Sequence, residues 1–108
     1  MSLAVFAWDP HKADANARKH GVGFDEATSA FLDESALLIP DPDHSHDEDR
    51  FLLLGNSARF RLLVVCHCYR EKEHVIRIIS ARKATRHEAA QYLGNAGCEK
   101  EACERKGS

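Results

Sequence analysis

The chain has 108 residues, of which 44% are hydrophobic and 30% are charged, and its formal net charge at pH 7 is −2. These values are typical of one soluble globular domain that is long enough for its own hydrophobic core. No apolar run approaches the roughly 20 residues that span a bilayer, and the N-terminus lacks the basic and apolar stretches of a secretion signal. We therefore expect a cytoplasmic protein without a membrane segment.

The small net charge hides a strong asymmetry along the chain. Residues 1–49 contain 3 Lys/Arg against 11 Asp/Glu, a net charge of −8, whereas residues 50–92 contain 9 against 3, a net charge of +6. A polyanion would be attracted to the second part and repelled by much of the first. This segregation keeps nucleic acid among the expected partners.

The first third of the chain predicts one short strand and two helices. A strand over residues 5–8 precedes a helix that Asp9 caps, with Pro10 at its first helical position. Gly21 supplies the left-handed exit of that helix. A second short helix begins near Asp25, with apolar residues at helical spacing on one side.

The rest of the chain predicts a meander followed by one more helix. Strands are expected over residues 36–40, 50–54, 62–69 and 74–80. The capping box from Thr85 to Glu88 starts the last helix, and beyond Gly94 the chain becomes small and polar. The order of elements predicts an α+β fold with an antiparallel sheet. We expect one domain over residues 1–93 and a flexible tail over 94–108.

The last hairpin predicts which side chains share a sheet face. If residues 71–73 form its turn, His67 lies opposite Arg77 and Cys68 lies opposite Ile76. Alternation then gives one apolar face to carry the helices (Val64, Cys66, Cys68, Ile76, Ile78). The other face is an open binding floor (Val65, His67, Tyr69, Val75, Arg77, Ile79). The alternative is a covered face on which His67 and Arg77 are merely hydrogen-bonded, and a shift of one residue would undo the pairing.

Residues 75–86 place an arginine within a β-branched strand, directly before a basic helix start. Arg77 lies between two apolar pairs, and three more cations follow (Arg82, Lys83, Arg86). An arginine is costly to cover unless an anion meets it, which indicates a phosphate ligand. An arginine that is solvated or paired with an internal carboxylate remains the alternative.

Other polar clusters are weaker signals. Cys66 and Cys68 lie in an apolar strand, which favours buried thiols over a zinc site. The acidic loop over residues 41–49 lacks the glycine and the final glutamate of a calcium-binding EF-hand, although His44 and His46 leave a weak transition-metal site as an alternative. We expect no metal and no cofactor. His20 ends a helix, where it either caps the helix or exchanges protons.

Several blocks of this sequence resemble the BrnT toxins. They cover about residues 4–93 and comprise the runs 6–13, 16, 19–22, 24–27, 41–51, 61–65 with 67, and 76–85 with 88 and 92. The resemblance implies a toxin of a bacterial type II toxin–antitoxin pair, with a twisted sheet similar to that of RelE-type ribonucleases and helices packed on one face. It also implies RNA cleavage that arrests translation. The implied partner is a BrnA-type ribbon-helix-helix antitoxin. The toxin would contact operator DNA only through this antitoxin.

Metal-free RNA cleavage needs a base, an acid and cations on the phosphate. As a hypothesis we assign the phosphate to three arginines (Arg50, Arg77, Arg82) and proton transfer to three further residues (His20, Glu26, His67). Five residues are expected to bind RNA elsewhere (Lys12, Arg61, Tyr69, Lys83, Arg86), with Trp8 more typical of the core. The alternative function is an inactive toxin homologue that only binds protein or RNA.

Overall fold

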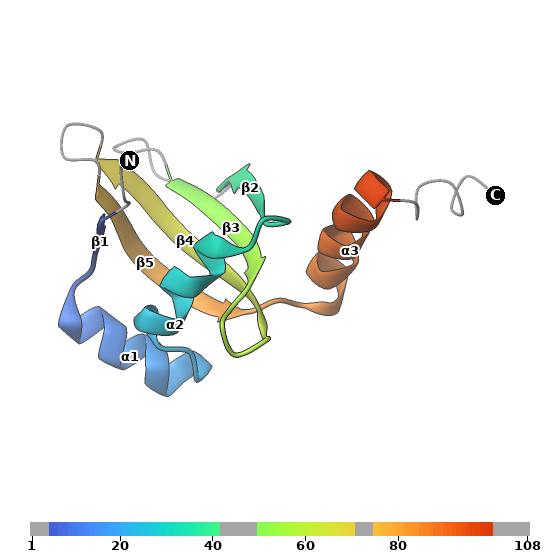
Figure 1. The fold of residues 1–108 in the computed structure, drawn as a ribbon. Helices are drawn as coiled ribbons and strands as arrows, with labels where there is room; N and C mark the ends of the chain where they lie inside the picture. The colour runs from blue at the N-terminus through green and yellow to red at the C-terminus, as the bar shows by residue number, and fades with distance from the viewer. Residues whose placement is uncertain (1–4, 42–49, 71–74, 101–108) are drawn as a thin grey trace.

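The computed structural model describes residues 5–41, 50–70 and 75–100 (Figure 1). A five-stranded sheet is combined with three α-helices and one 3-10 turn. In chain order the elements are β1 (Val5–Ala7), α1 (Pro10–His20), α2 (Phe24–Ser29), η1 (Ala30–Leu32), β2 (Leu37–Pro40), β3 (Arg50–Asn56), β4 (Leu62–Arg70), β5 (Val75–Lys83) and α3 (Arg86–Lys100). None of the helices in these ranges is long and apolar enough to cross a membrane.

Helix α1 begins and ends where its sequence signals predicted. The Asp9 carboxylate accepts a hydrogen bond from the His11 N–H at 2.8 Å, and Gly21 adopts a left-handed conformation with φ 70°. Asn16 is the only buried residue of this polar helix. Its amide nitrogen donates to the Ala81 carbonyl at 2.8 Å, and its oxygen accepts from the Ala81 N–H at 3.1 Å. A single buried amide thus ties α1 to β5.

The sheet is mixed, with the strand order β1-β5-β4-β3-β2. The strands β2 to β5 form an antiparallel meander, but β1 pairs with β5 in the parallel direction. The prediction of an entirely antiparallel sheet is therefore wrong at one edge. Two helices and three strands separate β1 from β5, and such a long connection allows parallel pairing where a tight turn does not.

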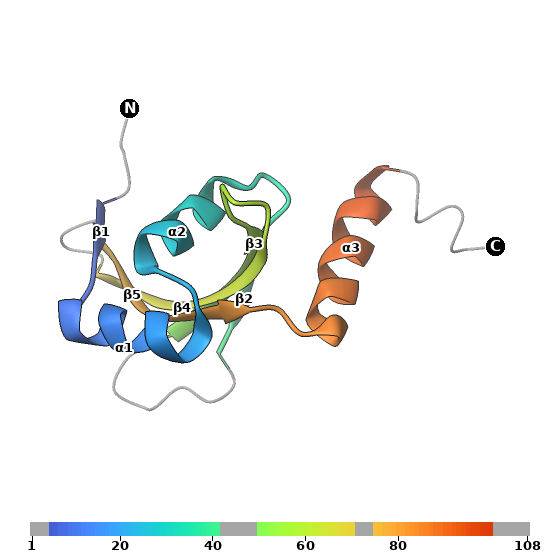
Figure 2. The ribbon, with the colours of Figure 1, turned by 90° about the horizontal axis from the view of Figure 1, so that it is seen from below.

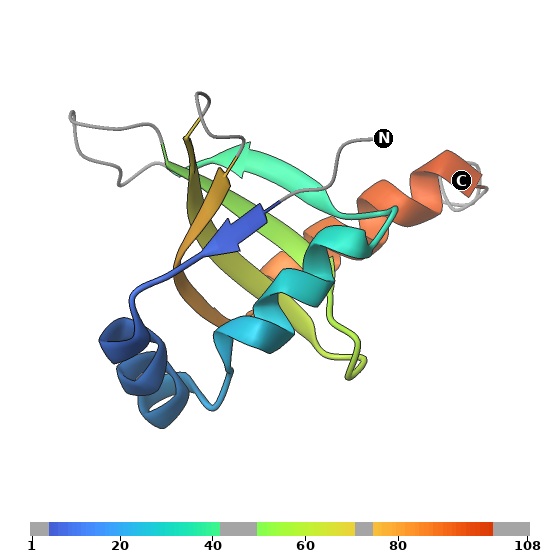
Figure 3. The same cartoon turned by 60° about the vertical axis from the view of Figure 1, so that its left-hand side comes forward.

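The main core lies between the sheet and the N-terminal helices. It joins Phe24, Ala27 and Ala30 to inward residues of the strands (Leu53, Leu63, Val65, Ile78, Ala81). Figure 2 shows the sheet curving around α2, and Figure 3 shows α2 crossing in front of the strands with α1 at their lower left. We call this the helix face of the sheet and the opposite side the outer face.

Helix α3 does not share the helix face. Tyr92 packs with Leu54 and Val64, whose side chains point to the outer face, and the rest of α3 stands away from the sheet (Figure 1). The Tyr92 hydroxyl donates to Asp33 at 2.5 Å, which anchors the helix beside η1. The expectation that all three helices cover one face is thus wrong. The helix also continues to Lys100, past the expected end at Gly94.

The pairing of β4 with β5 differs from the predicted hairpin. Cys68 lies opposite Arg77, His67 lies opposite Ile78, and the register shifts between Cys66 and His67, so that Ile79 has no direct partner. A β-bulge of this kind inserts one extra residue and reverses the alternation beyond it. The predicted pairs His67–Arg77 and Cys68–Ile76 are wrong, and so are the faces assigned from them.

Candidate functional site

Two arginines lie in one row across the outer face of the sheet. Arg50 on β3 and Arg77 on β5 are both register partners of Cys68 on β4, so the three side chains project from the same face. Neighbouring strands are about 4.8 Å apart, which puts the Arg50 and Arg77 backbones roughly 10 Å from each other. Both arginines are partly buried. A pair of guanidinium groups at this spacing can contact one phosphodiester from two sides.

Arg82 points to the same face from the far end of β5, because its partner is Val64. Its guanidinium donates two hydrogen bonds of 2.8 Å to Glu88, one to each carboxylate oxygen. Glu88 also accepts from the Thr85 N–H at 2.8 Å, so the predicted capping box at the start of α3 is confirmed. The Arg82 guanidinium and then the Thr85 contacts hold the pKa of Glu88 at about 2. Arg82 is therefore paired with an internal carboxylate, which was the alternative to a phosphate ligand.

Cys66 and Cys68, on the same strand as the middle of the arginine row, are thiols that are not joined in a disulfide. Cys66 lies 3.4 Å from the Asp41 carboxylate, measured from Sγ to Oδ2. Burial and the nearby Asp41 raise the pKa of Cys66 to about 11, so the thiol stays protonated and is a poor nucleophile. Within the described ranges no three His, Cys, Asp or Glu residues group together as metal ligands do. His44 and His46 lie outside those ranges.

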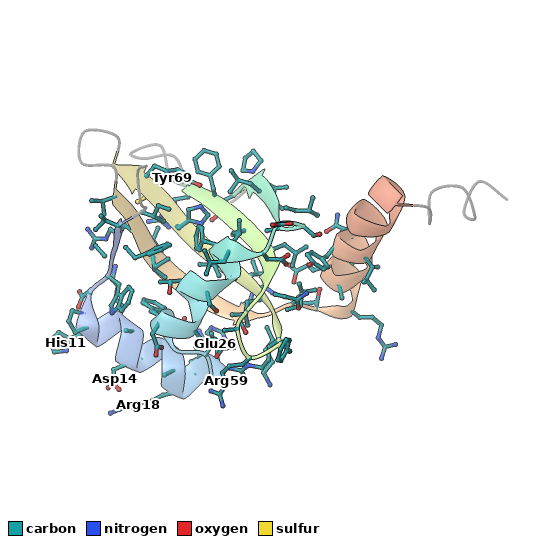
Figure 4. The ribbon with its side chains drawn as sticks, in the orientation of Figure 1. His11, Asp14, Arg18, Glu26, Arg59 and Tyr69 are labelled. Carbon is teal, nitrogen blue, oxygen red and sulfur yellow. The ribbon has the colours of Figure 1, made fainter. Side chains whose placement is uncertain are left out.

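His67 lies on the helix face and has no exposed surface. Its ring contacts Phe31 with centroids 4.8 Å apart, and its Nε2 lies 3.1 Å from the Tyr69 hydroxyl. Burial lowers the pKa of His67 and favours the neutral ring. The predicted open binding floor is therefore wrong for His67, because the N-terminal helices cover that face. Tyr69 is 41% exposed near the last residue of β4, at the end of the sheet opposite to Arg59, which precedes β4 (Figure 4).

Glu26 and Arg61, predicted for proton transfer and RNA binding, form an ion pair. The Arg61 Nε donates to Oε2 of Glu26 at 2.9 Å, its Nη2 contacts Oε1, and the Ser57 hydroxyl donates to Oε2 at 2.7 Å. Arg61 also donates to the Gly21 carbonyl at 3.1 Å. The Arg61 contact above all keeps the pKa of Glu26 below its usual value. This network links α1, α2 and the β3–β4 loop.

The remaining predicted residues lie at separate positions. His20 is partly buried at the end of α1, and Lys12 is exposed on the same helix. Lys83 and Arg86 are exposed on either side of the turn from β5 into α3. Trp8 packs edge-on against Phe24 with centroids 6.0 Å apart, as expected for a core residue. The sheet separates His20 and Glu26 from the three arginines of the outer face.

Comparison with known proteins identifies the family. A family model described as the ribonuclease toxin BrnT of a type II toxin–antitoxin system matches residues 8–88. The chain belongs to the BrnT family. The crystal structure of the Brucella abortus ribonuclease toxin BrnT superposes with a TM-score of 0.60 and 26% identity, over 79% of this chain and 100% of that one. No curated protein sequence matches the chain.

Membership of the BrnT family fixes the broad function. The chain is a ribonuclease toxin of a type II toxin–antitoxin system, which implies an antitoxin as its partner. The resemblance inferred from the sequence is confirmed, and so is an α+β fold similar to that of BrnT.

Two partners of the predicted site residues lie at positions with a local sequence signal. Glu88 belongs to the predicted capping box, a position from which its side chain also reaches Arg82 at the end of β5. Ser57 lies in a turn, where hydroxyl groups bond nearby backbone and side chains. Asp41 has no such signal, since its contact with Cys66 depends on how β2, β3 and β4 align.

Proposed function

We propose that this BrnT-family toxin cleaves RNA on the outer face of its sheet, with Arg50 and Arg77 as the ligands of the scissile phosphate. The observation that carries the proposal is the row Arg50–Cys68–Arg77, in which two guanidinium groups flank a small side chain. Acidic α2 and the buried Glu26 lie on the other side. The acidic residues of α2 disfavour a polyanion next to that helix, and the arginine row on the outer face attracts one.

The chemistry follows from what arginine does to a phosphate. Attack by the ribose 2′-hydroxyl builds negative charge on the phosphoryl oxygens, and fixed guanidinium groups stabilise that charge without reorganising. Arginine stays protonated throughout and binds two oxygens with its planar fork. We propose that these cations supply the charge stabilisation without a divalent metal ion, in a reaction of the RelE-like kind.

Arg82, Glu26 and His67 have structural roles in this proposal. Arg82 is bound to Glu88, and Glu26 is bound to Arg61 and Ser57. His67 has no exposed surface, so that an RNA ribose cannot touch it. His20 is partly exposed but lies on the helix face, away from the arginine row. The phosphate assignment therefore rests on the position of the arginine row on the outer face.

Further proposals concern the cellular context. We propose that RNA cleavage arrests translation, that a BrnA-type ribbon-helix-helix protein neutralises the toxin, and that operator DNA is contacted only through that protein. The uneven charge supports two separate partners, since residues 1–49 are acidic and residues 50–92 are basic. An inactive homologue that keeps only the binding surfaces is the second candidate.

The test is RNA cleavage by purified protein in the presence of EDTA. Arg50→Ala and Arg77→Ala should each slow cleavage about 10²-fold or more, as expected when a group that stabilises developing charge is removed. Arg18→Ala is the matched control, because Arg18 is an exposed arginine of α1 that pairs with Asp14 one turn away. Full activity of both outer-face variants would refute the phosphate assignment. No cleavage by the wild-type chain would favour the inactive homologue.

A further inference from the structure

The β3–β4 loop, residues 57–61, presents an unusual phenylalanine. Phe60 is 91% exposed and has φ 62°, and it is the one residue other than glycine with positive φ in the described part of the chain. Left-handed backbone is unfavourable for a bulky residue, and an exposed aromatic ring gains nothing from burial. A residue that is unfavourable in both respects at a surface site points to a function.

Hydrogen bonds hold the Phe60 backbone in this conformation. The Ser57 hydroxyl oxygen accepts from the Arg59 N–H at 3.1 Å, and the Ser57 carbonyl accepts from the Phe60 N–H at 2.9 Å. The Ser57 N–H donates to the Arg61 carbonyl at 2.8 Å, which closes the loop. The ion pair between Arg61 and Glu26 then fixes the loop to α2. The ring is therefore presented by a rigid support.

Cations surround the end of the sheet that carries this loop. Arg59 is exposed directly beside Phe60 at the loop tip (Figure 4). Lys83 is exposed at the end of β5, next to the first residues of β4, and Ala84 bonds to the Leu62 carbonyl at 2.9 Å. A protruding aromatic ring among cations is the combination that binds unpaired nucleotides, since bases stack on the ring and phosphates meet the charges.

We propose that Phe60 stacks on an unpaired RNA base and that Arg59 binds the adjoining phosphate. The inference rests on the proposed RNA-cleaving function and extends it, because it adds a second contact outside the arginine row. A strand rises about 3.3 Å per residue, so Lys83 lies on the order of 20 Å from Arg77 along β5. A few nucleotides span that distance, so that one RNA strand can run from Arg77 to the end of the sheet that carries Lys83 and the loop. Phe60 thereby positions the substrate and is not a catalytic residue.

The test measures binding of a fluorescein-labelled single-stranded RNA with 2′-O-methyl riboses, which cannot be cleaved by 2′-hydroxyl attack. Phe60→Gly should weaken RNA binding about 5- to 150-fold, which is the loss of affinity expected when one base no longer stacks on an aromatic ring. Phe60→Trp should keep the affinity, whereas Phe60→Leu should lose most of it, because leucine is apolar but has no π-face. Arg59→Ala should make binding less dependent on salt.

Protein stability separates a binding role from a folding role. Phe60→Gly should raise the thermal midpoint by a few degrees, because glycine adopts φ 62° without steric cost. A variant that is more stable yet binds RNA less tightly supports the proposal. If Phe60→Gly binds RNA as wild type does but no longer forms the antitoxin complex, the ring belongs to a protein interface and the proposal is overturned.

Parallel measurements on Arg77→Ala distinguish the two proposals. Loss of affinity in Phe60→Gly together with normal cleavage by both Arg50→Ala and Arg77→Ala supports base stacking at the loop and refutes the phosphate assignment. Normal affinity in Phe60→Gly together with slow cleavage by Arg77→Ala supports the phosphate assignment and refutes base stacking at the loop. Undetectable RNA binding by the wild-type chain overturns both.

Discussion

Arg77 and Arg82 project from the same face of the sheet, although their residue numbers on β5 differ by an odd number. In a regular strand they would point to opposite faces, but the bulge between Cys66 and His67 on the paired strand leaves Ile79 unmatched and restores the common direction. The bulge thus brings Arg82 to the face that Arg50 and Arg77 share. His67 lies on the helix face, beside Phe31, because it alternates along β4 with Leu63 and Val65.

The pair formed by Arg82 and Glu88 gives a prediction about acid stability. Glu88→Gln keeps a side chain that can complete the capping box but removes the charge opposite Arg82. Both side chains are partly exposed, at 22% for Glu88 and 38% for Arg82, so solvent screening limits the loss to about 1 kcal/mol at pH 7. Urea denaturation measures this difference.

The difference should depend on pH in a defined direction. The pKa of folded Glu88 is about 2, below that of an unfolded glutamate near 4.3, so the stabilisation is complete above the unfolded value and is lost as the pH falls towards 2. At pH 3 the gap between wild type and Glu88→Gln should shrink by more than half. Asp14→Asn is the control, because the Asp14–Arg18 pair is exposed and should contribute nothing measurable. A gap that does not change with pH would disprove the charge pair.

We predict that Glu26 stabilises the fold and takes no part in catalysis. Glu26→Gln removes the charge that receives Arg61 and the Ser57 hydroxyl, and charge-assisted hydrogen bonds of a buried carboxylate are worth about 1.5–3 kcal/mol. We expect a loss of stability in that range, measured by urea denaturation. The cleavage rate per folded molecule should stay within about twofold. A fall of 10²-fold or more at unchanged folding would instead identify Glu26 as a general acid or base.

His67 should make the fold sensitive to mild acid. Burial lowers the pKa of His67 in the folded state, so below about 6.5, the value in the unfolded chain, the unfolded state binds the proton more readily. Stability should therefore fall as the pH drops from 7 to 5, by up to roughly 1.4 kcal/mol per pH unit. His67→Phe should flatten this dependence, whereas His11→Ala, a change at an exposed position, should not. Parallel pH profiles for all three proteins would contradict a buried neutral His67.

Local signals in the sequence predicted the helices well. The Asp9 cap, the Gly21 exit and the capping box at Thr85 all appear in the structure, because each depends on residues within one turn of the helix. The sheet was harder to predict, since the parallel pairing of β1 with β5 joins segments that are far apart in the chain.

The register of the last hairpin explains why the predicted site was only partly assembled. The prediction placed His67 opposite Arg77, but between the turn and the bulge the register is offset by one residue, since Arg70 pairs with Val75 and His67 pairs with Ile78. An offset of one residue moves each β5 side chain of that stretch to the other face relative to β4. The structure therefore groups Arg77 with Arg50 through Cys68, and no composition or spacing rule in the sequence sets this offset.

Mapping the RNA contact surface tests the central claim most directly. Photo-crosslinking of an uncleavable single-stranded RNA that contains 4-thiouridine, followed by peptide mapping, shows which face of the sheet meets the RNA. We predict crosslinks in β4 and β5 near Cys68 and Arg77, with loss of those crosslinks in Arg77→Ala but not in Arg18→Ala. Crosslinks confined to the exposed side of α1, around Lys12 and Lys19, would contradict an RNA site on the outer face.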